Sequence, residues 1–243
     1  MRVVLVLAAV GTAAGALAVT GVVPNAFAGT EGPGTFALTT NTAGGRTFQL
    51  QIAASQLTSF VNTNLTGMAF RLNSGGNWPA IPVSMSFFDI FVGPGVAPSA
   101  MSNTFASNFT GGVTQVRNGS ISFNPGDFPT GGTPNAFGPN INFNLAPYFY
   151  AGGDLSIMMR FATQAGTGGT PTQSPLDAVA ASDTGNGWGT LFAVRWTGSS
   201  AGTTGGNANF LVTRLTASAV PEPASIAVLS LGAAVLLRRR RIR

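Results

Sequence analysis

The six residues Thr47-Phe48-Gln49-Leu50-Gln51-Ile52 alternate strictly between polar and apolar side chains. Successive side chains of a β-strand point to opposite faces, so this alternation places Phe48, Leu50 and Ile52 on one face and the two glutamines on the other. The same alternation returns at residues 141–145. Both segments are therefore predicted to be half-buried β-strands.

Further apolar runs of strand length are separated by clusters of Gly, Pro, Asn and Ser. They occupy residues 67–72, 83–92, 119–123, 154–163, 189–196 and 210–215. No window between the two ends of the chain has the period of an amphipathic helix. The sequence predicts one all-β domain over residues 29–219, a single antiparallel β-sandwich of jelly-roll-like topology, with a barrel as the open alternative.

Three segments are long and rich in Gly: residues 93–112, 124–140 and 164–187. We expect them to be loops at the rim of the sandwich. Such loops are where ligand contacts usually lie, and they also serve as flexible connections.

The N-terminal segment has the three regions of a secretory signal peptide. Arg2 is followed by an apolar run over residues 3–19 and then by Ala26-Phe27-Ala28, which has small side chains at its first and third positions. We therefore predict a signal peptide over residues 1–28, recognised at Ala26 and Ala28 and cleaved before Gly29.

The C-terminal segment, residues 220–243, also has three parts. Val220 is followed by Pro221-Glu222-Pro223, where the two prolines prevent a helix from running out of the domain into the tail. Residues 224–237 carry no charge, and as a helix they would span about 21 Å, short of the roughly 30 Å hydrocarbon core of a bilayer. Four consecutive arginines then hold the far end on the cytoplasmic side: Arg238, Arg239, Arg240 and Arg241.

This order of Pro-Glu-Pro, short apolar helix and Arg cluster over 238–243 resembles the PEP-CTERM sorting signal of exported bacterial proteins. In that family an exosortase, a membrane transpeptidase-like cysteine protease, recognises the signal, and the signal accompanies exopolysaccharide and biofilm export. The resemblance implies processing near Val220, Pro221, Glu222 and Pro223, which would be substrate residues. An ordinary C-terminal tail anchor is the alternative that the same hydropathy allows.

The net charge of +5 comes from the two ends of the chain. Residues 29–219 hold six Arg and six acidic residues, and the excess lies in Arg2 and the five arginines of the tail, offset by Glu222. A balanced domain offers no basic surface to neutralise phosphates, so no nucleic-acid partner is expected.

The missing residue types exclude several kinds of site. The chain has no Cys, no His and no Lys. It therefore has no disulfide, no Ser-His-Asp triad, no Cys nucleophile, no Schiff-base lysine and no His/Cys zinc site, and no cofactor or metal is expected. Carboxylate chemistry remains, and Asp127 and Asp154 are the candidates for a glycoside hydrolase, although both stand in sequences typical of turns.

Four aromatic residues outside the predicted strands are candidates for a saccharide platform, because flat rings with a polar handle suit the apolar faces of sugars. They are Trp78, Trp188, Tyr148 and Tyr150. The alternative is that these rings cap the core.

Asp89 is an acidic residue on the apolar face of a predicted strand, which it shares with Val83, Met85, Phe87 and Phe91. A carboxylate buried without a partner would cost several kcal/mol. We expect Asp89 to pair with an arginine from the middle of another strand, the candidates being Arg160, Arg195 and Arg214.

Asp177, Asp183 and Asn186 offer oxygen atoms within one predicted loop, but the string lacks the alternating acids of a calcium loop.

Taken together, the sequence predicts a non-enzymatic exported protein of the cell envelope or extracellular matrix, associated with exopolysaccharide or biofilm. Its expected partners are the secretion machinery, an exosortase, the membrane before processing, and polysaccharide. A carbohydrate-binding module and a carboxylate hydrolase are the alternatives.

Overall fold

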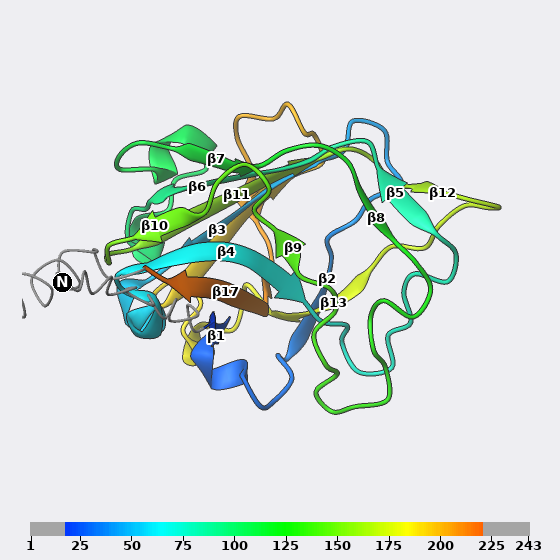
Figure 1. Ribbon diagram of the computed structural model, residues 1–243, viewed down its shortest axis with the longest axis horizontal. Helices are drawn as coiled ribbons and strands as arrows, with labels where there is room; N and C mark the ends of the chain where they lie inside the picture. Colours follow the sequence, from blue (N-terminus) through cyan, green and yellow to red (C-terminus); the bar gives the residue numbers. More distant parts are fainter. Residues whose placement is uncertain (1–17, 221–243) are drawn as a thin grey trace, which may run out of the picture.

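The computed structural model describes residues 18–220, which fold as antiparallel β-sheets (Figure 1). Within that range there is no α-helix, and none of the six short 3-10 helices is long and apolar enough to cross a membrane. The predicted antiparallel all-β class is confirmed. The predicted helix 224–237 and residues 1–17 of the predicted signal peptide lie outside the described residues, and the jelly-roll detail stays a prediction.

Two large sheets make up most of the fold. One has the order β1-β17-β4-β10, with β9 also paired to β4. Its strands are β1 (Ala18–Val23), β17 (Thr213–Ala219), β4 (Thr63–Phe70), β10 (Tyr148–Tyr150) and β9 (Ile141–Asn142). The other has the order β15-β14-β3-β11-β6-β7. Its strands are β15 (Gly206–Asn207), β14 (Phe192–Thr197), β3 (Arg46–Ile52), β11 (Leu155–Phe161), β6 (Phe88–Pro94) and β7 (Thr114–Arg117).

Two small three-stranded sheets and the 3-10 helices complete the fold. The small sheets are β12 (Ala165–Gly166), β5 (Val83–Met85) and β8 (Ile121–Phe123), and β16 (Phe210–Leu211), β13 (Pro175–Val179) and β2 (Gly34–Ala37). The 3-10 helices are η1 (Asn25–Phe27), η2 (Ala54–Gln56), η3 (Thr58–Phe60), η4 (Pro98–Ala100), η5 (Phe105–Asn108) and η6 (Thr184–Asn186). The segment 164–187, predicted to be a loop, therefore contains a buried strand, β13.

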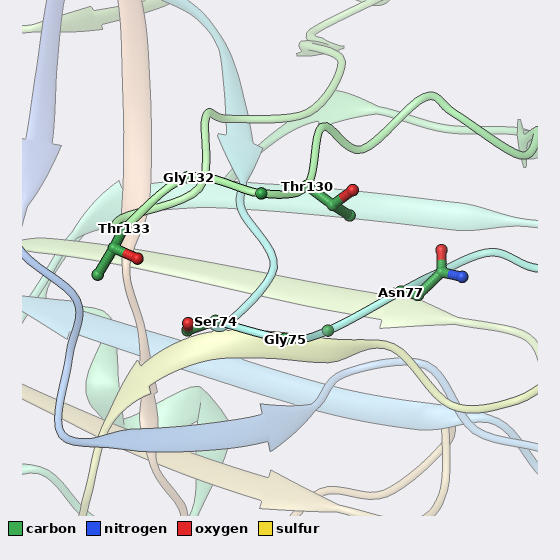
Figure 2. Close-up of a pocket in the computed structure, with 8 residues that line it drawn as sticks. Ser74, Gly75, Asn77, Thr130, Gly132 and Thr133 are labelled. Carbon is green, nitrogen blue, oxygen red and sulfur yellow. The ribbon is translucent and has the colours of Figure 1, made fainter.

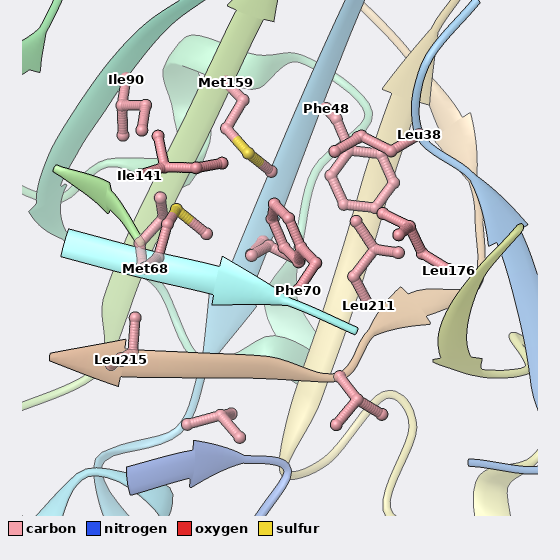
Figure 3. Packing of buried hydrophobic residues seen from close by; sticks show 14 of the residues in the cluster. Leu38, Phe48, Met68, Phe70, Ile90, Ile141, Met159, Leu176, Leu211 and Leu215 are labelled. Atoms are coloured by element: carbon pink, nitrogen blue, oxygen red, sulfur yellow. The ribbon is translucent and has the colours of Figure 1, made fainter. Parts of the chain in front are cut away.

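The apolar core lies between the two large sheets (Figure 3). Met68 and Phe70 of β4 and Leu215 of β17 gather there with Phe48 of β3 and Met159 of β11, and all five are buried. The alternating apolar positions of each strand supply these side chains, as the period of two predicts.

The second face of β3 is also covered, so the prediction of a half-buried strand is wrong there. Gln49 and Gln51 are fully buried beneath the segment that carries η4 and η5. Gln51 Nε2 donates to the Asn108 carbonyl at 2.8 Å, and Asn108 Nδ2 donates to Gln49 Oε1 at 2.8 Å. The Gly-rich segment 93–112 is thus hydrogen-bonded onto the sheet.

Replacing Asn108 with Ala should lower the free energy of unfolding by about 3 kcal/mol. The change leaves Gln49 Oε1 and the Ser102 N–H and carbonyl without their buried partner. Urea denaturation of the mature domain measures the loss. Asn118→Ala, whose side chain is exposed, is the matched control and should stay within about 0.5 kcal/mol of wild type. Equal stability of the two variants would contradict a structural role for this contact.

Candidate functional site

The C-terminal strand β17 leads directly into the tail. Its side chains alternate cleanly, with Thr213, Leu215 and Ala217 buried. β17 lies between β1 and β4, so Ser218 stands opposite Ala18 on one side and Asn64 on the other. Figure 1 shows the three strands side by side. The two ends of the described chain therefore leave the same end of the same sheet.

The sheet carries exposed apolar side chains at the end where the tail leaves. Val220, which follows β17 directly, is 42% exposed. Phe149 of β10 stands opposite Asn64 and is 50% exposed, and Val61, two residues before β4, is 42% exposed. We call Val61, Phe149 and Val220 the exit end.

Tyr150 of β10 lies in the same sheet as β17, with β4 between them. It stands opposite Thr63, which in turn stands opposite Ala219, the last residue of β17. Its ring is buried and its hydroxyl donates to the Gly153 carbonyl. Burial, with smaller contributions from the charges of Asp154 and Tyr148, raises the pKa of Tyr150 to about 12.

The raised pKa predicts a loss of stability in alkaline solution. The unfolded chain releases the phenol proton near pH 10, while the folded protein keeps it until about pH 12. The free energy of unfolding should therefore fall by about 2–3 kcal/mol as the pH rises through this window. Denaturation at several pH values measures the slope. Tyr150→Phe should flatten it, whereas Tyr148→Phe should keep most of it, and equal slopes in the two variants would contradict the assignment.

The tail itself matches a known family model, described as the PEP-CTERM protein-sorting motif, over residues 219–241. Residues 219–241 are a PEP-CTERM sorting motif. The match begins at Ala219, the last residue of β17, so no linker separates the PEP-CTERM motif from the folded sheet. The motif marks an exported protein that is held at the membrane and processed there by an exosortase. No curated protein and no solved structure matches the chain.

The predicted processing residues all fall within the PEP-CTERM motif, as do the four membrane-stop arginines. Of these, only Val220 lies within the described residues. Pro221, Glu222, Pro223 and the arginines lie outside them, and the processing and membrane-stop roles of these residues stay predictions.

Outside the PEP-CTERM motif, the four aromatic candidates do not form one platform. Trp78 is buried, its Nε1 donates to the Thr172 carbonyl at 2.9 Å, and its ring packs on Phe123 and Phe128 at centroid distances of 5.4 and 5.1 Å. A ring enclosed in this way cannot stack on a sugar. Tyr150 is equally buried. The expectation of a platform is therefore corrected for these two residues, which are part of the core.

Trp188 and Tyr148 are half-buried and pack against the core. Trp188 Nε1 donates to the Ala208 carbonyl at 3.2 Å. Burial raises the pKa of Tyr148 above its ordinary value of 10. Both side chains thus contribute to the packing of the fold, and glycan stacking at either one stays a prediction.

The expected ion pair of Asp89 is not formed. The strand breaks at residues 86–87, so the buried face changes to Phe88, Ile90 and Val92, and Asp89 turns to the opposite, half-buried face. Arg160 does stand opposite Asp89 across β6 and β11. Among residues 18–220, however, neither Asp89 nor any of the three candidate arginines takes part in a salt bridge within 4.0 Å.

The three candidate arginines have other contacts. Arg195 donates to Asn103 Oδ1 at 2.9 Å and to the Met101 carbonyl at 2.8 Å. The guanidinium of Arg214 lies 5.1 Å from the ring centre of Phe137, and that of Arg160 lies 6.0 Å from the ring centre of Phe91. Their charges are accommodated by carbonyls and aromatic faces, which stabilise a guanidinium without a carboxylate.

The buried ion pair of this domain joins Arg71 of the bridge after β4 to Asp177 of β13. Arg71 Nε donates to Asp177 Oδ2 at 2.7 Å, and both side chains are almost completely buried. Burial raises the pKa of Asp177 above its ordinary value, while the hydrogen bond and charge of Arg71 and the Gly32 N–H oppose that rise. Sequence analysis missed this pair because its members lie 106 positions apart; the only signal was an arginine within an apolar run.

The three oxygen-bearing side chains of residues 177–186 are each engaged in contacts within the protein. Asp177 is enclosed with Arg71, and Asp183 and Asn186 bond to each other in the η6 turn, where Asn186 Nδ2 donates to Asp183 Oδ2 at 2.6 Å. In the described part of the chain, no three acidic side chains gather where they could hold a metal ion.

Both hydrolase candidates accept hydrogen bonds from backbone N–H groups. Asp127 Oδ2 accepts a hydrogen bond from the Asn124 N–H at 2.7 Å, and Asp154 Oδ1 accepts one from the Ala54 N–H at 2.8 Å. Asp127 therefore closes its own turn, which is the ordinary use of Asp there. Asp154 instead joins the residue before β11 to the first residue of η2, 100 positions earlier in the chain.

An open cleft of about 390 Å³ lies between two Gly-rich turns, 74–77 and 130–133 (Figure 2). Ser74, Asn77, Thr130 and Thr133 supply its polar side chains. The cleft can offer hydrogen bonds but has no titratable or aromatic side chain in its lining.

Proposed function

We propose that this chain is a non-enzymatic exported protein whose β-domain is the cargo and whose PEP-CTERM motif is a removable tag. One observation carries the proposal: the motif begins where β17 ends. Because β17 is paired on both sides, the domain is complete before Val220. Removal of the motif therefore takes nothing from the core.

The contacts of the acidic residues support a structural role for the domain. Asp177 is paired with Arg71, Asp127 and Asp183 accept hydrogen bonds within turns, and Asp154 accepts one from the distant Ala54 N–H. A general acid or base has to be within reach of a substrate proton. Carboxylates that hold the backbone in this way support a structural role, such as that of a matrix or envelope component. For such a role a stable domain with an electrically balanced surface is sufficient.

The finer location is proposed from the family resemblance. In that family the signal accompanies exopolysaccharide export, so the processed domain is expected at the outer surface or in the extracellular polysaccharide fraction. Before processing, the chain is attached to the membrane, with the exit end nearest the bilayer.

Replacing all three residues of the Pro221-Glu222-Pro223 motif with Ala should abolish conversion of the full chain to its processed form in a host that has an exosortase. The reason is that the enzyme recognises this segment rather than the apolar helix alone. Intact mass and membrane fractionation give the result. A variant with Pro125→Ala, an exposed proline far from the tail in sequence, is the control and should be processed like wild type.

Normal conversion of the triple variant would contradict exosortase processing and favour a simple tail anchor. Wild-type chain in a host without the exosortase should remain in the membrane fraction at its full C-terminal mass. Processed domain that appears only in the cytosol would contradict the proposed location.

A further inference from the structure

We propose that signal peptidase cleaves this chain after Ala18, at Ala16-Leu17-Ala18, so that residues 19–28 stay in the mature protein as β1 and η1. This differs from cleavage after Ala28, which the sequence alone suggests. The proposal depends on export, but not on exosortase processing at the other end of the chain.

The pairing of β1 is the first argument. β1 is in continuous antiparallel register with β17, from Ala18 opposite Ser218 to Val23 opposite Thr213. Cleavage after Ala28 would remove the whole strand. β17 would then become an edge strand with a row of unpaired N–H and C=O groups, which is an aggregation hazard.

The core contacts of this segment are the second argument. Val23 is 0% exposed and Phe27 is 7% exposed, and both belong to the main apolar cluster. Gly21 packs so closely on the ring of Phe60 that an added Cβ would lie 2.9 Å from ring carbons. A segment that is packed this closely is part of the domain and not a discarded leader.

The buried ion pair is the third argument. Arg71 Nη2 donates to the carbonyl of Phe27 at 2.8 Å and also to the carbonyl of Thr30. Cleavage between Ala28 and Gly29 falls between these two acceptors. It would create an ammonium group at Gly29, close to a buried guanidinium of the same charge, and would release the Phe27 carbonyl.

The sequence before β1 supplies a suitable site. Ala16-Leu17-Ala18 has the same small-x-small pattern as Ala26-Phe27-Ala28, and it follows Arg2 and the apolar run. A leader of 18 residues is within the usual length of a signal peptide. Translocation precedes folding, so the fold does not instruct the peptidase. It does show which product can fold.

The test is the N terminus of the full chain after export, in a host without an exosortase so that the tail does not affect the result. Intact mass and N-terminal sequencing should show a mature protein that begins at Val19. A mature protein that begins at Gly29 overturns the proposal.

Two matched variants identify the site independently. Ala18 and Ala28 are both exposed, so a Tyr at either position leaves the packing unchanged. Ala18→Tyr should reduce the yield of the Val19 product by about tenfold or more, because the peptidase requires a small residue before the cleaved bond. Ala28→Tyr should be processed like wild type. The opposite pattern, with Ala28→Tyr blocked and Ala18→Tyr unaffected, overturns the proposal.

Discussion

Asp177→Asn is expected to lower the free energy of unfolding of the mature domain by about 3–5 kcal/mol. The change removes the negative charge but keeps the shape, so the buried guanidinium of Arg71 is left without a counter-charge. Domains of this size are stable by only about 5–15 kcal/mol, so the loss is a large part of the total. Urea denaturation and the shift of Tm measure it.

Two further variants distinguish the loss of stability caused by breaking the ion pair from a loss caused by any other disturbance of the fold. Asp183→Asn, in the η6 turn, is the matched control, since Asn caps a helix as well as Asp does. It should stay within about 0.5 kcal/mol of wild type. The double variant Arg71→Met with Asp177→Leu should recover part of the loss, but not all of it, because the Phe27 and Thr30 carbonyls and the Gly32 N–H would remain without partners. A loss below about 1 kcal/mol for Asp177→Asn would contradict the pair's role.

A domain that starts at Gly29 should be far less stable than one that starts at Val19, by about 5 kcal/mol or more. Burial of Val23 and Phe27 stabilises the domain by about 1.5–3 kcal/mol each. The hydrogen bonds between β1 and β17 add to this. The shorter domain is expected to be largely unfolded or aggregated at 25 °C, as circular dichroism and sedimentation would show.

Because the shorter domain could fail to fold for other reasons, point variants provide the sharper measurement. Phe27→Ala in the longer domain should cost about 3–5 kcal/mol, since the ring leaves a cavity in the core. Thr20→Ala, on the exposed face of β1, should stay within about 0.5 kcal/mol of wild type. Equal stability of the two point variants would show that this segment is not part of the folded domain.

Local pattern was sufficient for the position of β3 and β11 along the chain, which were predicted almost to the residue from their runs of apolar side chains. It failed at β6, where the break at residues 86–87 exchanges the two faces and removes Asp89 from the core side. It also failed for Gln49 and Gln51, whose polar groups are buried because a folded loop supplies their partners.

The targeting motif and the all-β class follow from the sequence by itself, because both depend on residues that are neighbours along the chain. The ion pair of Arg71 with Asp177, and the pairing of residues 18–23 with β17, were decided only by the tertiary structure. An apolar segment near the N terminus has the same composition whether it is a discarded leader or an edge strand. Its partner, β17, lies almost 200 positions away, and only folding brings the two together.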